Sequence, residues 1–185
     1  MKLLLVRHGQ TIANTMGALD TDFPGNSLDP TGLSQAASLP DLLGADRLGG
    51  ISSLWTSPIA RARQTIAPLE GVTGLMASID SGLREVLAGD LEMHTDARSV
   101  ACYTDTTRAW MIGRTAARLP GSPEDGADTF ARFDNAVTRI ARTTAEHVGA
   151  EGTALLVAHG TVLRLWTALA AAPGGGAGPA WIADH

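Results

Sequence analysis

The triplet Arg7-His8-Gly9 stands at the end of the first apolar run of the chain. That run, residues 3–6, predicts a buried strand. In an open α/β sheet, ligands bind just beyond the carboxyl ends of the strands. A guanidinium, an imidazole and a glycine at such an end supply positive charge, a nucleophile and a backbone that a ligand can approach closely. These three residues therefore indicate phosphate chemistry.

Two other predicted strands end in similar side chains. Residues 154–158 form a second apolar run, which His159 and Gly160 follow. A third strand, predicted near residues 51–55, leads into a helix that carries Arg61 near its start. Three strand ends that each deliver Arg or His can converge on one anion, because the carboxyl ends of parallel strands meet at one edge of the sheet.

A phosphate monoester held at these strand ends would give each side chain a role. Arg7 and Arg61 can each offer paired N–H donors to its non-bridging oxygens, and a protonated His159 adds a cationic donor. His8 is the better candidate for in-line attack on phosphorus, because a neutral imidazole with one nitrogen bonded to a carbonyl has the other nitrogen free. The candidate proton donor for the leaving oxygen is Glu85, which has apolar neighbours in the sequence. Spacing alone favours a surface position for this carboxylate.

Composition limits the partners that we expect. The chain has 185 residues, enough for one domain, and a net charge of −5, which gives no general case for nucleic acid or an anionic membrane. Lys2 is the only lysine, which excludes P-loop and Schiff-base lysines deeper in the chain, and Cys102 is the only cysteine. The first apolar run is too short for a signal peptide or a membrane span. We expect a cytoplasmic protein with a small phosphorylated substrate and no cofactor, and a homodimer is left open.

The order of the predicted elements defines the fold class. We expect strands at about residues 2–6, 51–55, 72–79 and 153–158. Helices alternate with them, including a long amphipathic helix from 127 to 148, and this alternation indicates a three-layer α/β/α sandwich around a mainly parallel sheet. One domain spans residues 1–185, and residues 82–125 read as a small helical cap insertion that could lie over the strand ends.

Proline and capping residues predict where two helices begin and break. Asp29 and Pro30 are typical of an N-cap followed by the first helical residue. Pro40 is expected to interrupt that helix. A second helix is expected over residues 58–69, with Pro58 at its start.

Five motifs occur in the order expected for a known family. They are Arg7 to Thr11 with Asn14, Leu28 to Ala36, Ser57 to Thr65, Leu83 to Glu85, and Val157 to Gly160. Together they resemble the signature of the histidine phosphatase superfamily, in its phosphoglycerate mutase-like branch, from residue 1 to about 170. The resemblance implies a metal-independent phosphomonoester hydrolase that forms a phosphohistidine on His8 and uses Glu85 as the proton donor. It implies a phosphate pocket lined by Arg7, Asn14, Arg61, His159 and Gly160.

Departures from the family pattern lie in the cap and leave the substrate open. Residues 89–93 replace a Gly-x-Trp-Glu-Gly run, and residues 125–128 replace a Gly-Glu-Ser. His94 could reach the site from the cap, although a solvated position is favoured. As an Asn in a turn, Asn14 can also simply satisfy backbone groups.

Other functions remain as alternatives. A phosphoglycerate mutase must shield its phosphoenzyme from water, and the short cap and glycine-rich residues 173–179 favour hydrolysis instead. A metallohydrolase is disfavoured, since no His-x-Glu or Asp-x-His cluster accompanies His8 or His159. A non-catalytic phosphate-binding module is the third alternative, although every expected catalytic residue type is present.

Overall fold

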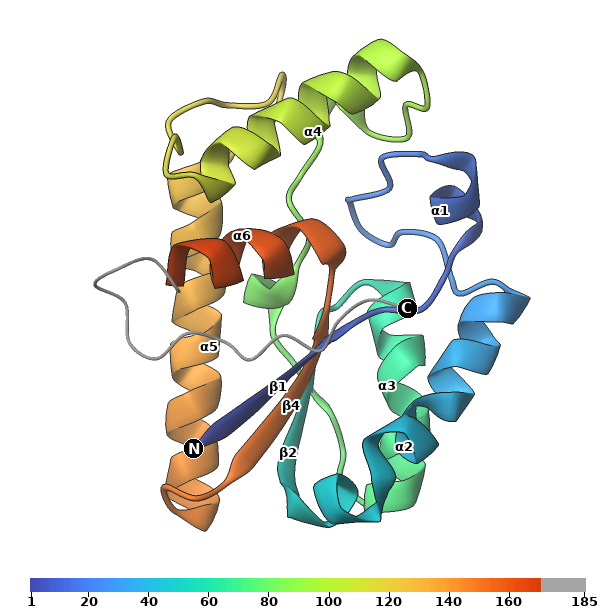
Figure 1. Ribbon diagram of the computed structural model, residues 1–185, viewed down its shortest axis with the longest axis vertical. Coiled ribbons are helices and arrows are strands. Elements are labelled where there is room, and N and C mark those ends of the chain that lie inside the picture. Colours follow the sequence, from blue (N-terminus) through green and yellow to red (C-terminus); the bar gives the residue numbers. More distant parts are fainter. Residues whose placement is uncertain (171–185) are drawn as a thin grey trace.

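The computed structural model describes residues 1–170, with a four-stranded parallel sheet at the centre (Figure 1). In spatial order the strands are β1 (Lys2–Arg7), β4 (Thr153–Ala158), β2 (Ile51–Thr56) and β3 (Ser78–Ile79). Strand β4 is the central partner: Val157 lies opposite Val6 of β1 and opposite Thr56 of β2. Because every strand pair is parallel, the sites suspected at the ends of β1, β2 and β4 meet at one edge of the sheet.

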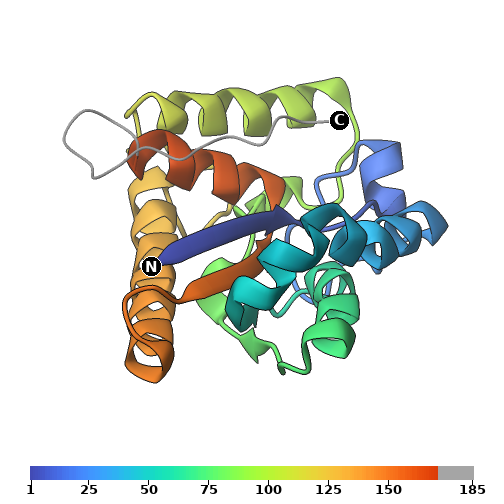
Figure 2. The same ribbon diagram turned by 60° about the horizontal axis from the view of Figure 1, so that its bottom comes forward.

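Helices cover both faces of this sheet, which confirms the predicted α/β class. They are α1 (Ile12–Met16), α2 (Pro30–Gly50), α3 (Ala60–Thr73), α4 (Ala97–Met111), α5 (Gly126–Val148) and α6 (Gly160–Ala170), with short 3-10 turns η1 (Ser81–Leu83) and η2 (Gly89–Leu91). Helices α2 and α3 lie on one face, and α5 and α6 lie on the other (Figures 1 and 2).

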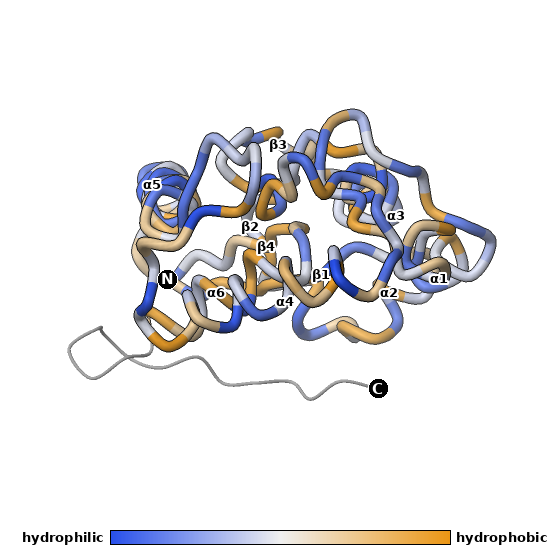
Figure 3. The backbone as a smooth tube through the Cα atoms, turned by 90° about the horizontal axis from the view of Figure 1, so that it is seen from above, coloured by the Kyte–Doolittle hydropathy of each residue, from blue (hydrophilic) through white to orange (hydrophobic). Residues whose placement is uncertain are grey.

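Side-chain alternation along the strands explains this layering. On β1, Leu3 and Leu5 pack toward α5 and α6, whereas Leu4 and Val6 pack toward α2 and α3. On β4 every residue is buried, as expected for a central strand covered on both faces, and hydrophobic segments gather around it in Figure 3. The first hydrophobic cluster joins β1 and β4 to Phe133, Ile140, Val162 and Leu165; the second joins them to Ala62, Ile66 and Leu69.

Three predicted boundaries differ from the structure. Helix α2 continues through Pro40 and breaks instead at Gly44, whose φ of 73° is a conformation that glycine adopts without a steric penalty. Helix α3 begins at Ala60 rather than at Pro58 and runs past Pro68 to Thr73. The strand expected over 72–79 is therefore reduced to Ser78–Ile79. By contrast, Asp29 caps α2 as predicted, accepting the N–H of Gly32.

The segment expected to form a cap contains η1, η2 and α4. Helix α4 lies alongside α6, beyond the carboxyl ends of the strands (Figures 1 and 2). Its fully buried Trp110 belongs to the same hydrophobic cluster as α5 and α6, and its indole N–H donates to the carbonyl of Ala117. Within residues 1–170, none of the helices has the length and apolar character needed to cross a membrane. The glycine-rich residues 173–179 lie outside the described residues.

Candidate active site

The ends of three strands are joined by hydrogen bonds and bring two histidines together. The backbone N–H of His8 donates to the carbonyl of Ala158 at 3.1 Å, and that of Ser57 donates to Val157 at 3.0 Å. The imidazole rings of His8 and His159 consequently lie 5.1 Å apart, measured between their centroids. The predicted convergence of His8, Arg61 and His159 is thus present in the fold.

The tautomer of His8 follows from its two ring contacts. Its Nδ1 lies 2.7 Å from the carbonyl oxygen of Gly9, which can only accept, so Nδ1 carries the proton. Its Nε2 accepts the Nε–H of Arg61 at 3.0 Å. Burial, aided by the positive charge of Arg61, lowers the pKa of His8 to about 3. At neutral pH the ring is therefore uncharged and its lone pair is on Nε2.

Arg61 lies in the first turn of α3 and is almost completely buried. Besides His8, it donates from one terminal nitrogen to the Asp20 carboxylate at 3.2 Å and from the other to the Asp20 carbonyl at 2.9 Å. Desolvation lowers the pKa of Arg61, and the negative charges of Asp20, Glu85 and Glu92 act in the opposite direction. The Arg61 guanidinium thus links helix α3 to the loop that carries Asp20 and to the candidate nucleophile His8.

His159 is fully buried and is held by Ser57. Its Nε2 lies 2.8 Å from the Ser57 hydroxyl, which also accepts the N–H of Ile59 at 3.3 Å. Its Nδ1 is the one buried side-chain polar atom in the described part of the chain that has no hydrogen-bond partner. Burial, followed by the charge of Arg61, lowers the pKa of His159 well below its usual value. This shift favours the neutral form of the His159 ring, which can still donate to an anion from one of its two nitrogens.

Glu85 is buried, in contrast to the surface position that spacing alone favours. Its Oε1 accepts the N–H groups of Val86 and Val162 at 2.8 Å each, and its Oε2 accepts that of Thr161 at 3.0 Å. Two of these donors belong to the first turn of α6, where unpaired N–H groups favour an anion. The carboxylate thus contacts backbone N–H groups as well as the apolar neighbours expected from the sequence. Two of these N–H groups belong to the residues that directly follow His159 and Gly160 in the chain.

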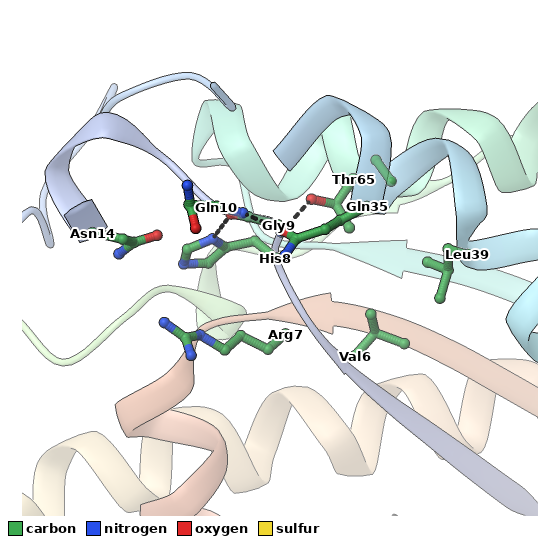
Figure 4. A pocket seen from close by; sticks show the side chains of 10 residues that line it. Val6, Arg7, His8, Gly9, Gln10, Asn14, Gln35, Leu39 and Thr65 are labelled. Atoms are coloured by element: carbon green, nitrogen blue, oxygen red, sulfur yellow. Dashed lines mark hydrogen bonds between the residues drawn. The ribbon is translucent and has the colours of Figure 1, made fainter. Parts of the chain in front are cut away.

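An open cavity reaches His8 from the side of β1 and α2 (Figure 4). It has a volume of about 360 Å³, and Arg7 and Asn14 line it together with His8. The exposed Arg7 side chain lies over Gly160, where an added Cβ would come within 3.2 Å of the guanidinium Nε. Asn14 accepts the N–H of Thr11 through its Oδ1 at 3.1 Å, as part of the capping box of α1. The buried Arg61, His159 and Glu85 are not among the lining residues.

Arg63 and His94 lie away from the nucleophile candidate. Arg63 is exposed on α3, because its two-residue offset from Arg61 turns it to another side of the helix. His94 is half-exposed before α4, where its Nδ1 lies 2.9 Å from the Ser99 hydroxyl and 3.4 Å from the Asp96 carboxylate. Within residues 1–170, no three side chains of His, Cys, Asp or Glu come together in a way that could hold a metal ion.

Sequence reasoning missed Asp20 and gave no role to Ser57. Ser57 lies in the predicted arginine motif and Asp20 lies between the first two motifs, but each acts on a side chain distant in sequence: Asp20 on Arg61, and Ser57 on His159. The available signal for Asp20 was its position as an acidic residue shortly after the Arg7–Thr11 motif, but acidic residues are also common in exposed loops.

The fold and the site together define a family. Residues 3–179 match the model of the Histidine phosphatase superfamily (branch 1), and the chain belongs to this family. The resemblance found in the five sequence motifs is thereby confirmed.

Two similar proteins come from Mycobacterium tuberculosis, and one of them is named as a phosphatase. The chain is 32% identical over 174 residues to the glucosyl-3-phosphoglycerate phosphatase of Mycobacterium tuberculosis, covering 90% of this chain and 74% of that protein. It is also 30% identical over 166 residues to the PE-PGRS family protein PE_PGRS11 of the same organism, where it covers 86% of this chain but only 28% of the relative.

Solved structures show the same fold. A mycobacterial glucosyl-3-phosphoglycerate phosphatase in complex with VO3 superposes with a TM-score of 0.74 at 28% identity, covering 92% of this chain and 82% of that one. The α-ribazole phosphatase of Shigella flexneri gives a TM-score of 0.72 at 26% identity, with 93% and 80% coverage.

Proposed function

We propose that this protein is a metal-independent phosphomonoester hydrolase that acts on a small phosphorylated metabolite through a phosphohistidine at His8. The observation that carries the proposal is the His8 ring itself: a neutral imidazole whose Nδ1 is bonded to a carbonyl and whose Nε2 lone pair meets a guanidinium. Membership of the histidine phosphatase superfamily, and relatives named as phosphatases of small phosphate esters, support it.

The reaction has two steps. In the first, the Nε–H of Arg61 moves from His8 Nε2 to a phosphoryl oxygen, and the freed Nε2 lone pair attacks phosphorus in line. The N–P bond forms and the P–O bond to the leaving group breaks, while Glu85, in its protonated form, gives its proton to the departing oxygen. In the second, Glu85 takes a proton from water, the water oxygen attacks phosphorus, and the N–P bond breaks to release phosphate and free His8. Arg61 already donates to Nε2, so a phosphoryl group arriving there meets this guanidinium at once.

The remaining pocket residues bind the non-bridging oxygens. Arg7 and Asn14 lie on the open side of His8, where a substrate enters, and Gly160 leaves room for the Arg7 side chain. His159 donates from Nδ1, the buried atom that lacks a protein partner. Residues 82–125, including α4, form the cap of one domain that spans the chain. The cytoplasmic location and a homodimer stay predictions.

A substrate panel tests this function directly. Purified protein is incubated with sugar phosphates, phosphoglycerate-type acids and nucleotides, with and without a chelator, and released phosphate is measured. We expect hydrolysis that the chelator does not reduce. Efficient interconversion of 3-phosphoglycerate and 2-phosphoglycerate in the presence of bisphosphoglycerate would show a mutase instead, and loss of activity that a divalent metal restores would show a metallohydrolase.

Glu85→Gln is expected to slow phosphorylation by alkyl phosphates about 10²-fold or more and by nitrophenyl phosphate only a few-fold. An alkoxide leaving group needs a proton, whereas nitrophenolate is already a stable anion. A burst experiment measures the phosphorylation step apart from dephosphorylation, which can also slow because the same carboxylate activates water. Glu92→Gln serves as the comparison. A dependence on the leaving group that appears in Glu92→Gln but not in Glu85→Gln would assign the acid to Glu92.

Ser57→Ala is expected to lower kcat/KM about tenfold by changing the tautomer of His159. A hydroxyl that donates to Nε2 places the ring proton on Nδ1, where it can bind a phosphoryl oxygen. Without the hydroxyl, the neutral ring is free to carry its proton on Nε2 and to turn a lone pair toward the anion. Nitrogen NMR of labelled His159 distinguishes the two tautomers. An unchanged Nδ1–H tautomer in the variant would contradict this role for Ser57.

A further inference from the structure

A carboxylate contacts one of the arginines of the proposed phosphate site, which is unexpected for a site that binds an anion. The Asp20 Oδ2 is 3.2 Å from a terminal nitrogen of Arg61, and the exposed fractions of the two side chains are 5% and 2%. The carbonyl of the same residue accepts from the other terminal nitrogen of Arg61 at 2.9 Å. One loop residue therefore holds both ends of the guanidinium.

The loop around Asp20 is built to keep this contact. Asn26 donates to the same Oδ2 from its backbone N–H at 3.0 Å and from its side-chain amide at 3.1 Å. Gly25, with a φ of 66°, passes so close to Arg61 that a Cβ there would lie 2.5 Å from a terminal nitrogen. On the cap side, Glu92 accepts the N–H of Thr21 at 2.8 Å. Asn26 thus fixes the Asp20 carboxylate directly, and Glu92 fixes the backbone of the next residue.

These contacts reduce the number of N–H groups and the positive charge that Arg61 can offer to a ligand. Of the five N–H groups of a guanidinium, three are directed to His8 and Asp20. The positive charge is also offset by a buried negative charge in direct contact, where screening by water is weak. With His8 and His159 neutral, Arg7 is the cation of the site that has no carboxylate in salt-bridge contact among the described residues.

We propose that Asp20 is a positioning residue that orients Arg61 toward His8 and reduces the affinity of the site for phosphate. This inference rests on the proposed hydrolase function. A hydrolase must release inorganic phosphate after each turnover, and a fully unpaired buried arginine would retain it. The Asp20 carboxylate keeps the guanidinium in place for the reaction while limiting its attraction for the product.

The test is the competitive inhibition constant of inorganic phosphate, measured for the wild type and for Asp20→Asn. The amide keeps the size of the side chain and an oxygen that can accept from Arg61, but it removes the negative charge. We expect phosphate to bind about fivefold or more tightly to Asp20→Asn, and vanadate to follow the same trend. Asp22→Asn is the matched control, because it removes the same charge from an exposed residue two positions away, and it should leave phosphate binding unchanged.

The sign of the change separates this role from a purely structural one. If Asp20 only supports the loop, its replacement misplaces Arg61, and phosphate binds more weakly or equally well; either result would overturn the proposal. Asp20→Ser, which also removes the charge, replaces Asp20→Asn if thermal unfolding shows that the latter does not fold. If the wild type neither hydrolyses phosphate esters nor binds phosphate, the hydrolase function is rejected as well. If the wild type is active but the Asp20 variants do not bind phosphate more tightly, only the role of Asp20 is rejected.

Discussion

His8→Ala is expected to lose turnover by about 10⁴-fold or more, since it removes the atom to which phosphorus is transferred. The wild type, mixed with labelled substrate and quenched during turnover, should carry a phosphoryl group that is labile in acid and stable in alkali. Mass spectrometry should place it on His8, and the variant should carry none.

The control for this experiment is folding. His8 lies at the end of β1 rather than in either hydrophobic cluster, so His8→Ala should still unfold cooperatively. His8→Asn provides a second variant, because its amide can still donate to the carbonyl of Gly9 as Nδ1 does. Adduct formation in either variant at the wild-type level would end the assignment of His8 as nucleophile.

Arg61→Ala should slow the phosphorylation step about 10²–10³-fold, the usual cost of removing one donor that stabilises a transition state. It should also weaken the binding of vanadate, a mimic of five-coordinate phosphorus, by a similar factor. Arg7→Ala should act in the same direction, because Arg7 lines the open side of the site. Rapid-quench kinetics and vanadate inhibition measure the two effects.

Arg63→Ala is the matched control for Arg61, since it removes the same side chain from an exposed position on the same helix. Arg61→Ala also leaves Asp20 as an unpaired buried carboxylate, which can destabilise the fold. Arg61→Lys keeps the charge but cannot reach His8 and both oxygens of Asp20 in one planar arrangement, so it should fold well and still be slow. Near-normal turnover and vanadate affinity in Arg61→Lys would show that the reaction does not need the planar guanidinium.

Local sequence was enough to find the strands that position the site. Buried strands β1 and β4 appear as short apolar runs, and α5 appears as apolar residues at helical spacing, because both signals come from neighbours in the chain. The helix break in α2 was misplaced for a related reason: Pro40 is the stronger local signal, but the positive φ at Gly44 depends on how the chain turns back toward β2. Short β3 had too few residues for any pattern.

Residue types and their order determined the family, the candidate nucleophile and the predicted pocket, since three of the five motifs lie at the end of a strand. The tertiary structure decided what cannot be read along the chain: that Glu85 accepts the N–H groups at the start of α6, that burial lowers the pKa of His159, and that Asp20 contacts Arg61. These features depend on burial and on contacts across 41 to 102 positions of sequence. Charge state and hydrogen-bond partners are properties of the folded surroundings, and for that reason only the fold could supply them.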